Sequence, residues 1–125
     1  NLINTNFSIK KGLNRLNFRS FEVQHGMIKT TAYVFNKVAY LSDCNKIPFK
    51  YYKYLKKLNY LIIDCLRYSK HPSHFNYDEA IEISKILKPK KTILTNLHVD
   101  LDYSTLVKKL PKNIIPAYDG LKFNF

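Results

Sequence analysis

Residues 60–95, YLIIDCLRYSKHPSHFNYDEAIEISKILKPKKTILT, contain the pattern that decides the fold. The apolar run at residues 60–63 is typical of a strand buried on both faces. Asn76, with Glu79 three residues later, forms a capping-box pattern that predicts a helix ending before the next proline. Residues 92–94 then predict a second buried strand. A strand, a helix and a strand in this order predict parallel strands and an α/β fold.

The segments before this unit predict more strands and a further helix. Residues 16–23 alternate apolar and polar side chains, which is the period of a half-buried strand. Residues 30–35 are β-branched and aromatic, and together with residues 38–41 they predict a hairpin. Pro48 and the spacing of the apolar side chains after it predict a helix over residues 49–58.

The segments after the central unit continue the alternation. Asp102 is a candidate N-cap for a helix that runs to Leu110 and ends at the following proline. Residues 114–118 are expected to be extended. The dipeptide Asp119-Gly120 predicts a turn, after which residues 121–125 are expected to return as a strand.

Length and composition limit the classes of protein that fit. At 125 residues the chain is expected to form one domain, β-rich over residues 1–43 and alternating α/β over residues 44–125. A hydrophobic content of 46% excludes a wholly disordered chain, and no apolar run reaches the roughly 20 residues of a membrane helix. The two cysteines have neither zinc-ribbon nor disulfide-framework spacing, and the first residues lack a signal-peptide pattern. We therefore expect a cytoplasmic protein without a membrane partner.

The charge is strongly positive, with a formal net value of +12. Such a charge favours an anionic partner such as nucleic acid or a phosphorylated small molecule. The type of cation weakens this interpretation, because 18 of the 21 basic residues are Lys and only Arg15, Arg19 and Arg67 are Arg. Most Lys residues fall in or just after predicted helices, where cations are typical of solvated faces and helix ends.

Several His and Asp residues follow predicted strands at their carboxyl ends, where function collects in open α/β sheets. These residues are His25, Asp43, Asp64, His71, His74 and His98. Each alone is more often an ordinary surface or turn residue. His and carboxylate are also the ligands of Zn, Mn and Fe sites, so their shared placement points to a metal site at one edge of the sheet.

Five strings occur in order: VAYLSD at residues 38–43, LIIDCLR at 61–67, HPSHF at 71–75, TNLHVDLDY at 95–103 and PAYDGL at 116–121. Together they resemble the metallo-β-lactamase fold, most closely its phosphoribosyl 1,2-cyclic phosphodiesterase branch of metal-dependent hydrolases. The resemblance runs from about Phe21 to the end of the chain. It implies the C-terminal half of an αββα sandwich, with one mixed sheet and flanking helices.

The resemblance also implies metal ligands. Asp43 matches the Asp that bridges two metals, and His25 matches a ligand of one of them. His98 is the best match to a ligand of the other, although the T-H-x-x-H pattern of many members reads TNLH here. The complete family site holds two divalent metals, expected to be Zn or Mn, whereas this chain alone is expected to hold one or none.

Further residues match positions around the substrate. His74 matches a catalytic His that lies near substrate, and Asp64 matches a carboxylate that orients a ligand His. Arg67 either pairs with Asp64 or faces a phosphate, and the sequence does not distinguish these roles. The substrate class implied is a phosphodiester, either a cyclic phosphate or a nucleotide-like compound.

One hallmark of the family is missing. Its His-x-His-x-Asp-His loop, which supplies ligands to both metals, has no counterpart among the four His residues. The N-terminal half of the family fold is likewise absent, so we expect residues 1–125 to be inactive alone. The resemblance then predicts an apolar sheet face covered by self-association or by a partner chain. The alternative is a non-catalytic basic module that binds nucleic acid or another partner.

Overall fold

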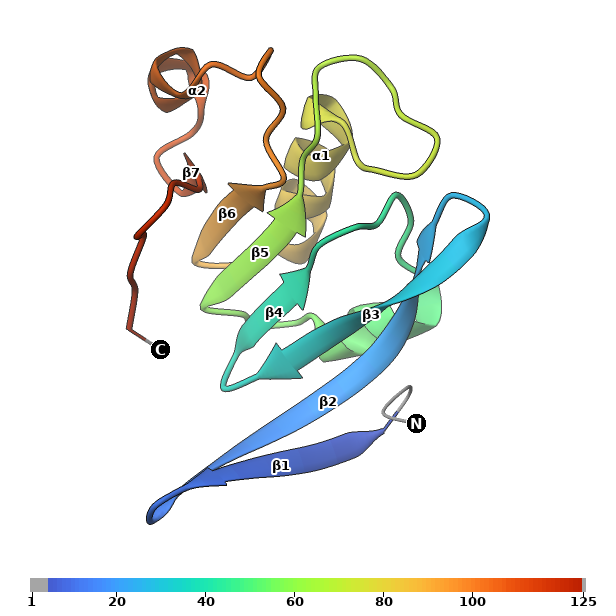
Figure 1. Ribbon diagram of the computed structural model, residues 1–125, viewed down its shortest axis with the longest axis vertical. Coiled ribbons are helices and arrows are strands. Elements are labelled where there is room, and N and C mark those ends of the chain that lie inside the picture. Colours follow the sequence, from blue (N-terminus) through green and yellow to red (C-terminus); the bar gives the residue numbers. More distant parts are fainter. Residues whose placement is uncertain (1–4, 125) are drawn as a thin grey trace.

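The computed structural model describes residues 5–124 (of Lys11, the backbone only), which form one seven-stranded sheet with short helices (Figure 1). The strands follow one another across the sheet in chain order. Their bounds are β1 Asn6–Lys11, β2 Asn14–His25, β3 Ile28–Phe35, β4 Val38–Leu41, β5 Tyr60–Asp64, β6 Lys91–Thr95 and β7 Ile114–Pro116. The helical elements are η1 Phe49–Tyr54, α1 Tyr77–Leu87 and α2 Tyr103–Lys109.

The sheet is mixed, as expected from the sequence. Strands β1 to β4 form an antiparallel meander, whereas β4, β5, β6 and β7 run parallel. Each parallel step contains a helical connection, because parallel neighbours need a crossover. Two antiparallel steps separate β2 from β4, so β2 points the same way as the parallel strands. The carboxyl ends of β2, β4, β5 and β6 therefore meet at one edge.

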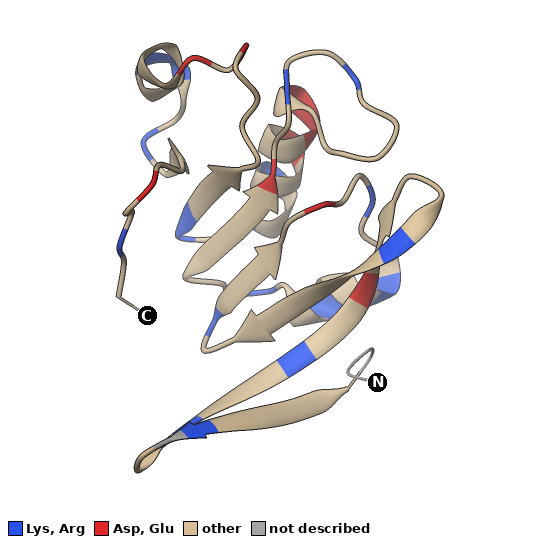
Figure 2. Ribbon diagram, in the orientation of Figure 1, with Lys and Arg blue, Asp and Glu red and all other residues tan. Residues whose placement is uncertain are grey.

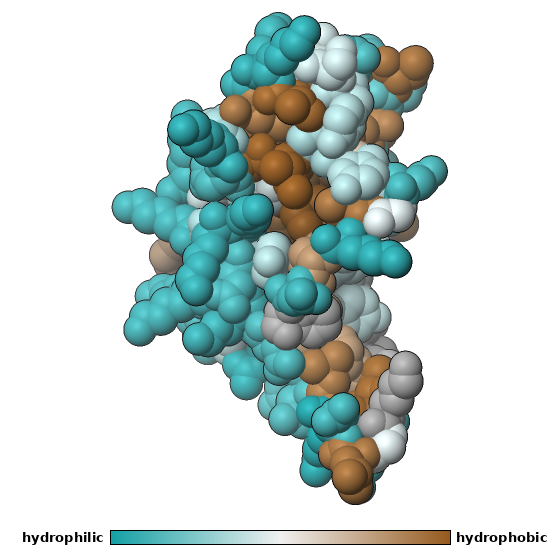
Figure 3. All heavy atoms as spheres, turned by 90° about the vertical axis from the view of Figure 1, so that its left-hand side faces the viewer, coloured by the Kyte–Doolittle hydropathy of each residue, from teal (hydrophilic) through white to brown (hydrophobic). Residues whose placement is uncertain are grey.

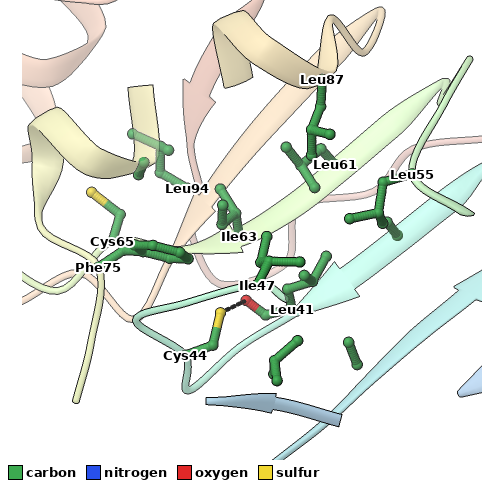
Figure 4. Packing of buried hydrophobic residues seen from close by; sticks show 14 of the residues in the cluster. Leu41, Cys44, Ile47, Leu55, Leu61, Ile63, Cys65, Phe75, Leu87 and Leu94 are labelled. Carbon is green, nitrogen blue, oxygen red and sulfur yellow. Dashed lines mark hydrogen bonds between the residues drawn. The ribbon is translucent and has the colours of Figure 1, made fainter. Parts of the chain in front are cut away.

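The hydrophobic core lies between one face of the sheet and the helical elements α1 and η1 (Figure 1). Leu61 and Ile63 of β5 point into this layer among side chains from several other elements (Figure 4). Leu87 of α1 and Leu55, which follows η1, are among them, and Leu61, Ile63 and Leu55 are wholly buried. Burying a Leu or Ile side chain contributes about 1.5–3 kcal/mol, so this layer anchors the helices to the sheet.

The two predicted helix caps are confirmed. The Asn76 side chain accepts a hydrogen bond from the Glu79 backbone N–H at 2.9 Å, and the Glu79 carboxylate accepts one from the Asn76 N–H at 3.0 Å. Asp102 caps α2 by accepting from the Thr105 backbone N–H at 2.8 Å. Hydrogen bonds from Thr105 and Ser104 hold the pKa of Asp102 down at about 2.

Two predicted elements differ from the structure, and one strand was not predicted. The helix expected over residues 49–58 is only the short 3₁₀ helix η1, because the aromatic side chains in this stretch are weak helix formers and Lys57 adopts a left-handed backbone conformation at φ 56°. Strand β1 was not predicted. Residues 121–124 form no strand and Phe125 lies outside the described residues; a turn from Leu121 N–H to Tyr118 O leads the chain away from β7.

The face of the sheet opposite the core carries partly exposed apolar side chains. Tyr33, Tyr40 and Ile62 occupy one row across β3, β4 and β5, and Tyr40 is 40% exposed. Seen from the left-hand side of Figure 1, hydrophobic surface runs through the middle of the molecule beside a hydrophilic flank (Figure 3). Over residues 5–124, no helix has both the length and the apolar character needed to cross a bilayer.

Candidate functional site

Asp64 forms the centre of the candidate site at the carboxyl end of β5. Its side chain is wholly buried. One carboxylate oxygen, Oδ2, accepts hydrogen bonds from the Cys44 backbone N–H at 2.9 Å and from His74 Nδ1 at 2.6 Å. The other, Oδ1, accepts from Asn96 Nδ2 at 3.2 Å. Burial raises the pKa of Asp64, and these three donors act against that rise by stabilising the carboxylate.

His74 is oriented by Asp64. Because Nδ1 faces the buried carboxylate, Nε2 is the ring atom left for other partners. The His74 side chain is 16% exposed, so the ring lies at the boundary between core and surface. This arrangement suits a side chain that donates a hydrogen bond or a proton from Nε2.

Asp43 is the exposed carboxylate of the cluster. It lies just after β4 with a left-handed backbone conformation at φ 49°, and its side chain is 53% exposed. Its backbone oxygen accepts from the Thr30 hydroxyl at 2.8 Å, which fixes this turn against β3. Its Oδ1 lies 3.1 Å from Asn96 Nδ2 and 4.0 Å from His74 Nδ1. Asn96 therefore joins the exposed and the buried carboxylates through one amide group.

His25 reaches the cluster from the end of β2. Its Nδ1 lies 2.9 Å from the Ser73 backbone oxygen, and its ring meets the His74 ring edge-on at a centroid distance of 4.6 Å. The His71 ring lies 5.0 Å from that of His74. The rings of His25 and His71 thus both lie close to the ring of His74, in the loop after β5.

Polar contacts hold this loop in place. The Asn45 side chain accepts from the Gly26 N–H at 3.2 Å and donates to the Pro72 oxygen at 2.9 Å. Among the described residues Arg67 does not pair with Asp64, and its alternative role, facing a phosphate, stays a prediction. Its guanidinium donates to the backbone oxygens of Ser69 and Lys70 at 3.3 and 2.8 Å, which folds the first part of the loop back on itself.

His98 lies apart from the other predicted site residues. Its Nδ1 is 2.9 Å from Asp100 Oδ1, and its side chain is 55% exposed. The backbone turns sharply after β6, with φ 61° at Asn96, and this turn directs the Asn96 side chain into the cluster. Sequence reasoning did not single out Asn96. The available signal was its place in TNLH, at the first His position of the T-H-x-x-H pattern.

The described residues do not complete a metal site by themselves. Across residues 5–124, no group of three or more His, Cys, Asp or Glu side chains is arranged to hold a metal ion. Cys44 and Cys65 lie nearby but are buried, and burial raises the pKa of both thiols, that of Cys65 to about 12. Both therefore remain protonated near neutral pH and lack the thiolate that binds metal.

Known proteins support the resemblance seen in the sequence. The sequence model of the beta-lactamase superfamily domain matches residues 2–96. Among solved structures, a diphosphatase from the PhnP family is 34% identical over 94% of this chain, with a TM-score of 0.87. The chain covers 46% of that protein, so it spans about half the length of the relative. A search of curated proteins found no match.

Two more distant structures share the fold. Human tRNase Z, short form, is 14% identical over 93% of this chain, with a TM-score of 0.69, and the chain covers 44% of it. The metallo-beta-lactamase fold protein YhfI from Bacillus subtilis is 17% identical over 92% of this chain, with a TM-score of 0.71, and the chain covers 51% of it. The mixed sheet and these matches agree. The chain belongs to the beta-lactamase superfamily domain family and has the metallo-β-lactamase fold.

Proposed function

We propose that this chain supplies one wall of a hydrolase site for phosphoric diesters or diphosphate anhydrides, and that residues outside the chain complete it. The observation that carries the proposal is the buried Asp64 carboxylate 2.6 Å from His74 Nδ1. Burying a carboxylate lowers the stability of the fold, and here the buried carboxylate orients an imidazole at the carboxyl edge of the sheet. The 34% identity with a diphosphatase supports the choice of a phosphoryl substrate.

The side chains of the chain divide the work. His74 donates from Nε2 to an oxygen of the phosphoryl group or of the leaving group, which stabilises charge that develops there. Asp64 accepts from Nδ1 and so orients the ring, and donation from Nε2 requires that both ring nitrogens carry a proton. Asp43 presents a carboxylate at the surface of the same cluster, 4.0 Å from His74. The family generally uses divalent metals, and the full ligand set needs groups beyond those described above.

Completion by a second segment also accounts for the partly exposed row of Tyr33, Tyr40 and Ile62. In the proposed active form this face is covered by the other half of the fold or by another chain. Alone, the chain is expected to associate through it.

A hybrid protein tests the proposed function. The portion of the 34%-identical diphosphatase that this chain does not cover is joined to this chain. Turnover of bis(p-nitrophenyl) phosphate and of a nucleotide diphosphate is measured with Mn²⁺ or Zn²⁺. We expect no turnover from the 125-residue chain alone, turnover from the hybrid, and a loss of about 10²–10⁴-fold in the hybrid carrying His74→Ala.

The controls separate folding from function. Circular dichroism and size-exclusion chromatography establish that each hybrid is folded. A folded, metal-loaded hybrid without turnover would refute the proposal, as would robust turnover by the isolated chain that disappears in Asp43→Ala. The role of His98 as a metal ligand stays a prediction. Full turnover by the hybrid carrying His98→Ala would mean that the side chain stays beside Asp100 and takes no part in the site. Loss of turnover in this hybrid would place His98 in the site.

A further inference from the structure

The positive charge is concentrated in the first half of the chain. Residues 1–60 contain eleven Lys and Arg against two acids, Glu22 and Asp43, whereas residues 61–125 contain ten against seven. Figure 2 shows blue positions along the β1–β2 hairpin and the adjacent helical segment, and red on β2 beside that segment. Glu22 of β2 lies near Lys50 and is paired with Lys29 at 3.1 Å, so cations outnumber acids on the surface around β1, β2 and η1.

This surface is hollowed. A hollow of about 480 Å³ lies against the β1–β2 hairpin and the end of β3. Its lining includes Arg15, Arg19, Asn17 and Asn36. Two of the three arginines of the chain thus line one concavity, although Arg is the scarcer cation by far.

Both guanidinium groups are held in position with donors to spare. Arg15 Nε donates to the Ser8 hydroxyl at 2.9 Å, and Arg19 Nε donates to Asn6 Oδ1 at 3.0 Å. Within the described part of the chain, the terminal nitrogens of both groups have no hydrogen-bond partner. A guanidinium fixed through Nε presents its remaining N–H groups as a preorganised fork for phosphate.

Arg19 links the first hollow to a second. The second hollow, of about 130 Å³, is lined by Arg19, Tyr51 and Tyr54 among others. The Arg19 guanidinium lies 4.1 Å from the centroid of the Tyr54 ring. Lys50 and Lys53 place their ammonium groups 4.9 and 5.0 Å from the Tyr51 and Tyr54 rings, respectively. Tyr51 is only 8% exposed and stacks on Phe21, so Tyr54 and the Arg19 guanidinium are the flat groups that remain partly exposed beside the cations.

We propose that this surface, the hairpin–η1 groove, binds single-stranded nucleic acid. Cations spaced along a groove track a phosphate backbone, and flat aromatic or guanidinium planes between them stack unpaired bases. An acidic peptide would use the charges but not the stacking planes. The groove lies away from the Asp43–Asp64–His74 edge, so this binding does not depend on the proposed hydrolase activity.

The test measures fluorescence anisotropy of a 5′-fluorescein-labelled 15-nucleotide oligouridine against the 125-residue chain at several KCl concentrations. We expect saturable binding that weakens with salt. Lys50→Gln/Lys53→Gln removes two cations, so the slope of log K against log[salt] should fall by about 1.4, at roughly 0.7 for each phosphate contact. The matched control Lys108→Gln/Lys112→Gln removes the same charge near α2 and should leave the slope unchanged.

Arg19→Gln tests the guanidinium plane and should weaken binding about tenfold or more, which corresponds to the loss of one stacked base. Because Arg19 also bonds to Asn6, circular dichroism must show a native fold, and the Lys variants remain decisive if it does not. Equal effects of the two Lys pairs would overturn the proposal. So would binding of uridine monophosphate or of oligoglutamate as tight as that of the 15-mer.

Discussion

Replacing Asp64 tests whether this buried carboxylate organises the site. Asp64→Ala removes the acceptor of three hydrogen bonds: those from the Cys44 N–H, His74 Nδ1 and Asn96 Nδ2. The Cys44 N–H is then buried without an acceptor, which costs about 1–3 kcal/mol, and the charge-assisted bond from His74 is lost as well. We expect a total loss of about 3–5 kcal/mol in the free energy of unfolding, as for a broken buried ion pair. For a domain stable by about 5–15 kcal/mol, this is a large fraction.

Asp64→Asn gives the matched comparison. Oδ2 accepts two of the three hydrogen bonds, so an amide oxygen in that place keeps both, while the amide nitrogen faces the side chain of Asn96. Only the bond to the exposed Asn96 is lost, and we expect a cost of about 1 kcal/mol. Asp43→Asn, at the exposed carboxylate, should change stability by less than about 0.5 kcal/mol.

Urea unfolding followed by circular dichroism measures these differences, and amide hydrogen exchange reports the Cys44 N–H directly. Exchange at Cys44 should be much faster in Asp64→Ala than in Asp64→Asn. The reasoning is wrong if Asp64→Ala costs less than about 1 kcal/mol, or if the Ala and Asn variants are equally unstable.

Two further substitutions test the turn beside the site and the cap of α2. Gly26 and Gly12 both have a left-handed backbone, at φ +58° and +61°, but a Cβ built on Gly26 would lie 2.9 Å from Ser73 Cβ, whereas one on Gly12 would meet open space. Gly26→Ala should therefore lower the free energy of unfolding, measured in urea, by at least about 1 kcal/mol more than Gly12→Ala. Equal losses would contradict the close contact. The pKa of Asp102 is lowered from 3.8 to about 2, so its ionisation stabilises the fold above pH 3.8, and this contribution is lost as the pH falls through about 2. Asp102→Asn keeps a capping side chain that does not titrate. As the pH falls from 3.8 to about 2, the free energy of unfolding of the wild type should therefore fall relative to that of the variant. Parallel pH profiles of the two proteins would contradict the lowered pKa of Asp102.

Local patterns predicted most of the elements because local physics forms them. The apolar run of β5, the capping box at Asn76 and the N-cap at Asp102 each act within a few residues, and the structure confirms all three. The prediction was wrong where local preference is weak. Residues 49–58 combine a helical apolar spacing with aromatic side chains, and only η1 forms there.

The candidate site was predictable in outline but not in its contacts. The alternation of strands and helices places His25, Asp43 and Asp64 at one edge of the sheet before any coordinates are known. Which polar side chain faces that edge after β6 depends on a single left-handed residue, Asn96, and so Asn96 enters the cluster while His98 points to Asp100. A side chain's direction after a tight turn is set by the backbone around it, which sequence spacing does not specify.

The sequence by itself determined the fold class, the family and the edge at which the polar residues gather, because hydrophobic period, caps and ordered motifs are local properties of the chain. Only the tertiary structure decided which of those residues touch. It also brought Arg19 onto Tyr54 and beside Arg15, and so revealed the hairpin–η1 groove. A net charge of +12 says nothing about where its cations lie, whereas strand pairing and packing fix their positions in space.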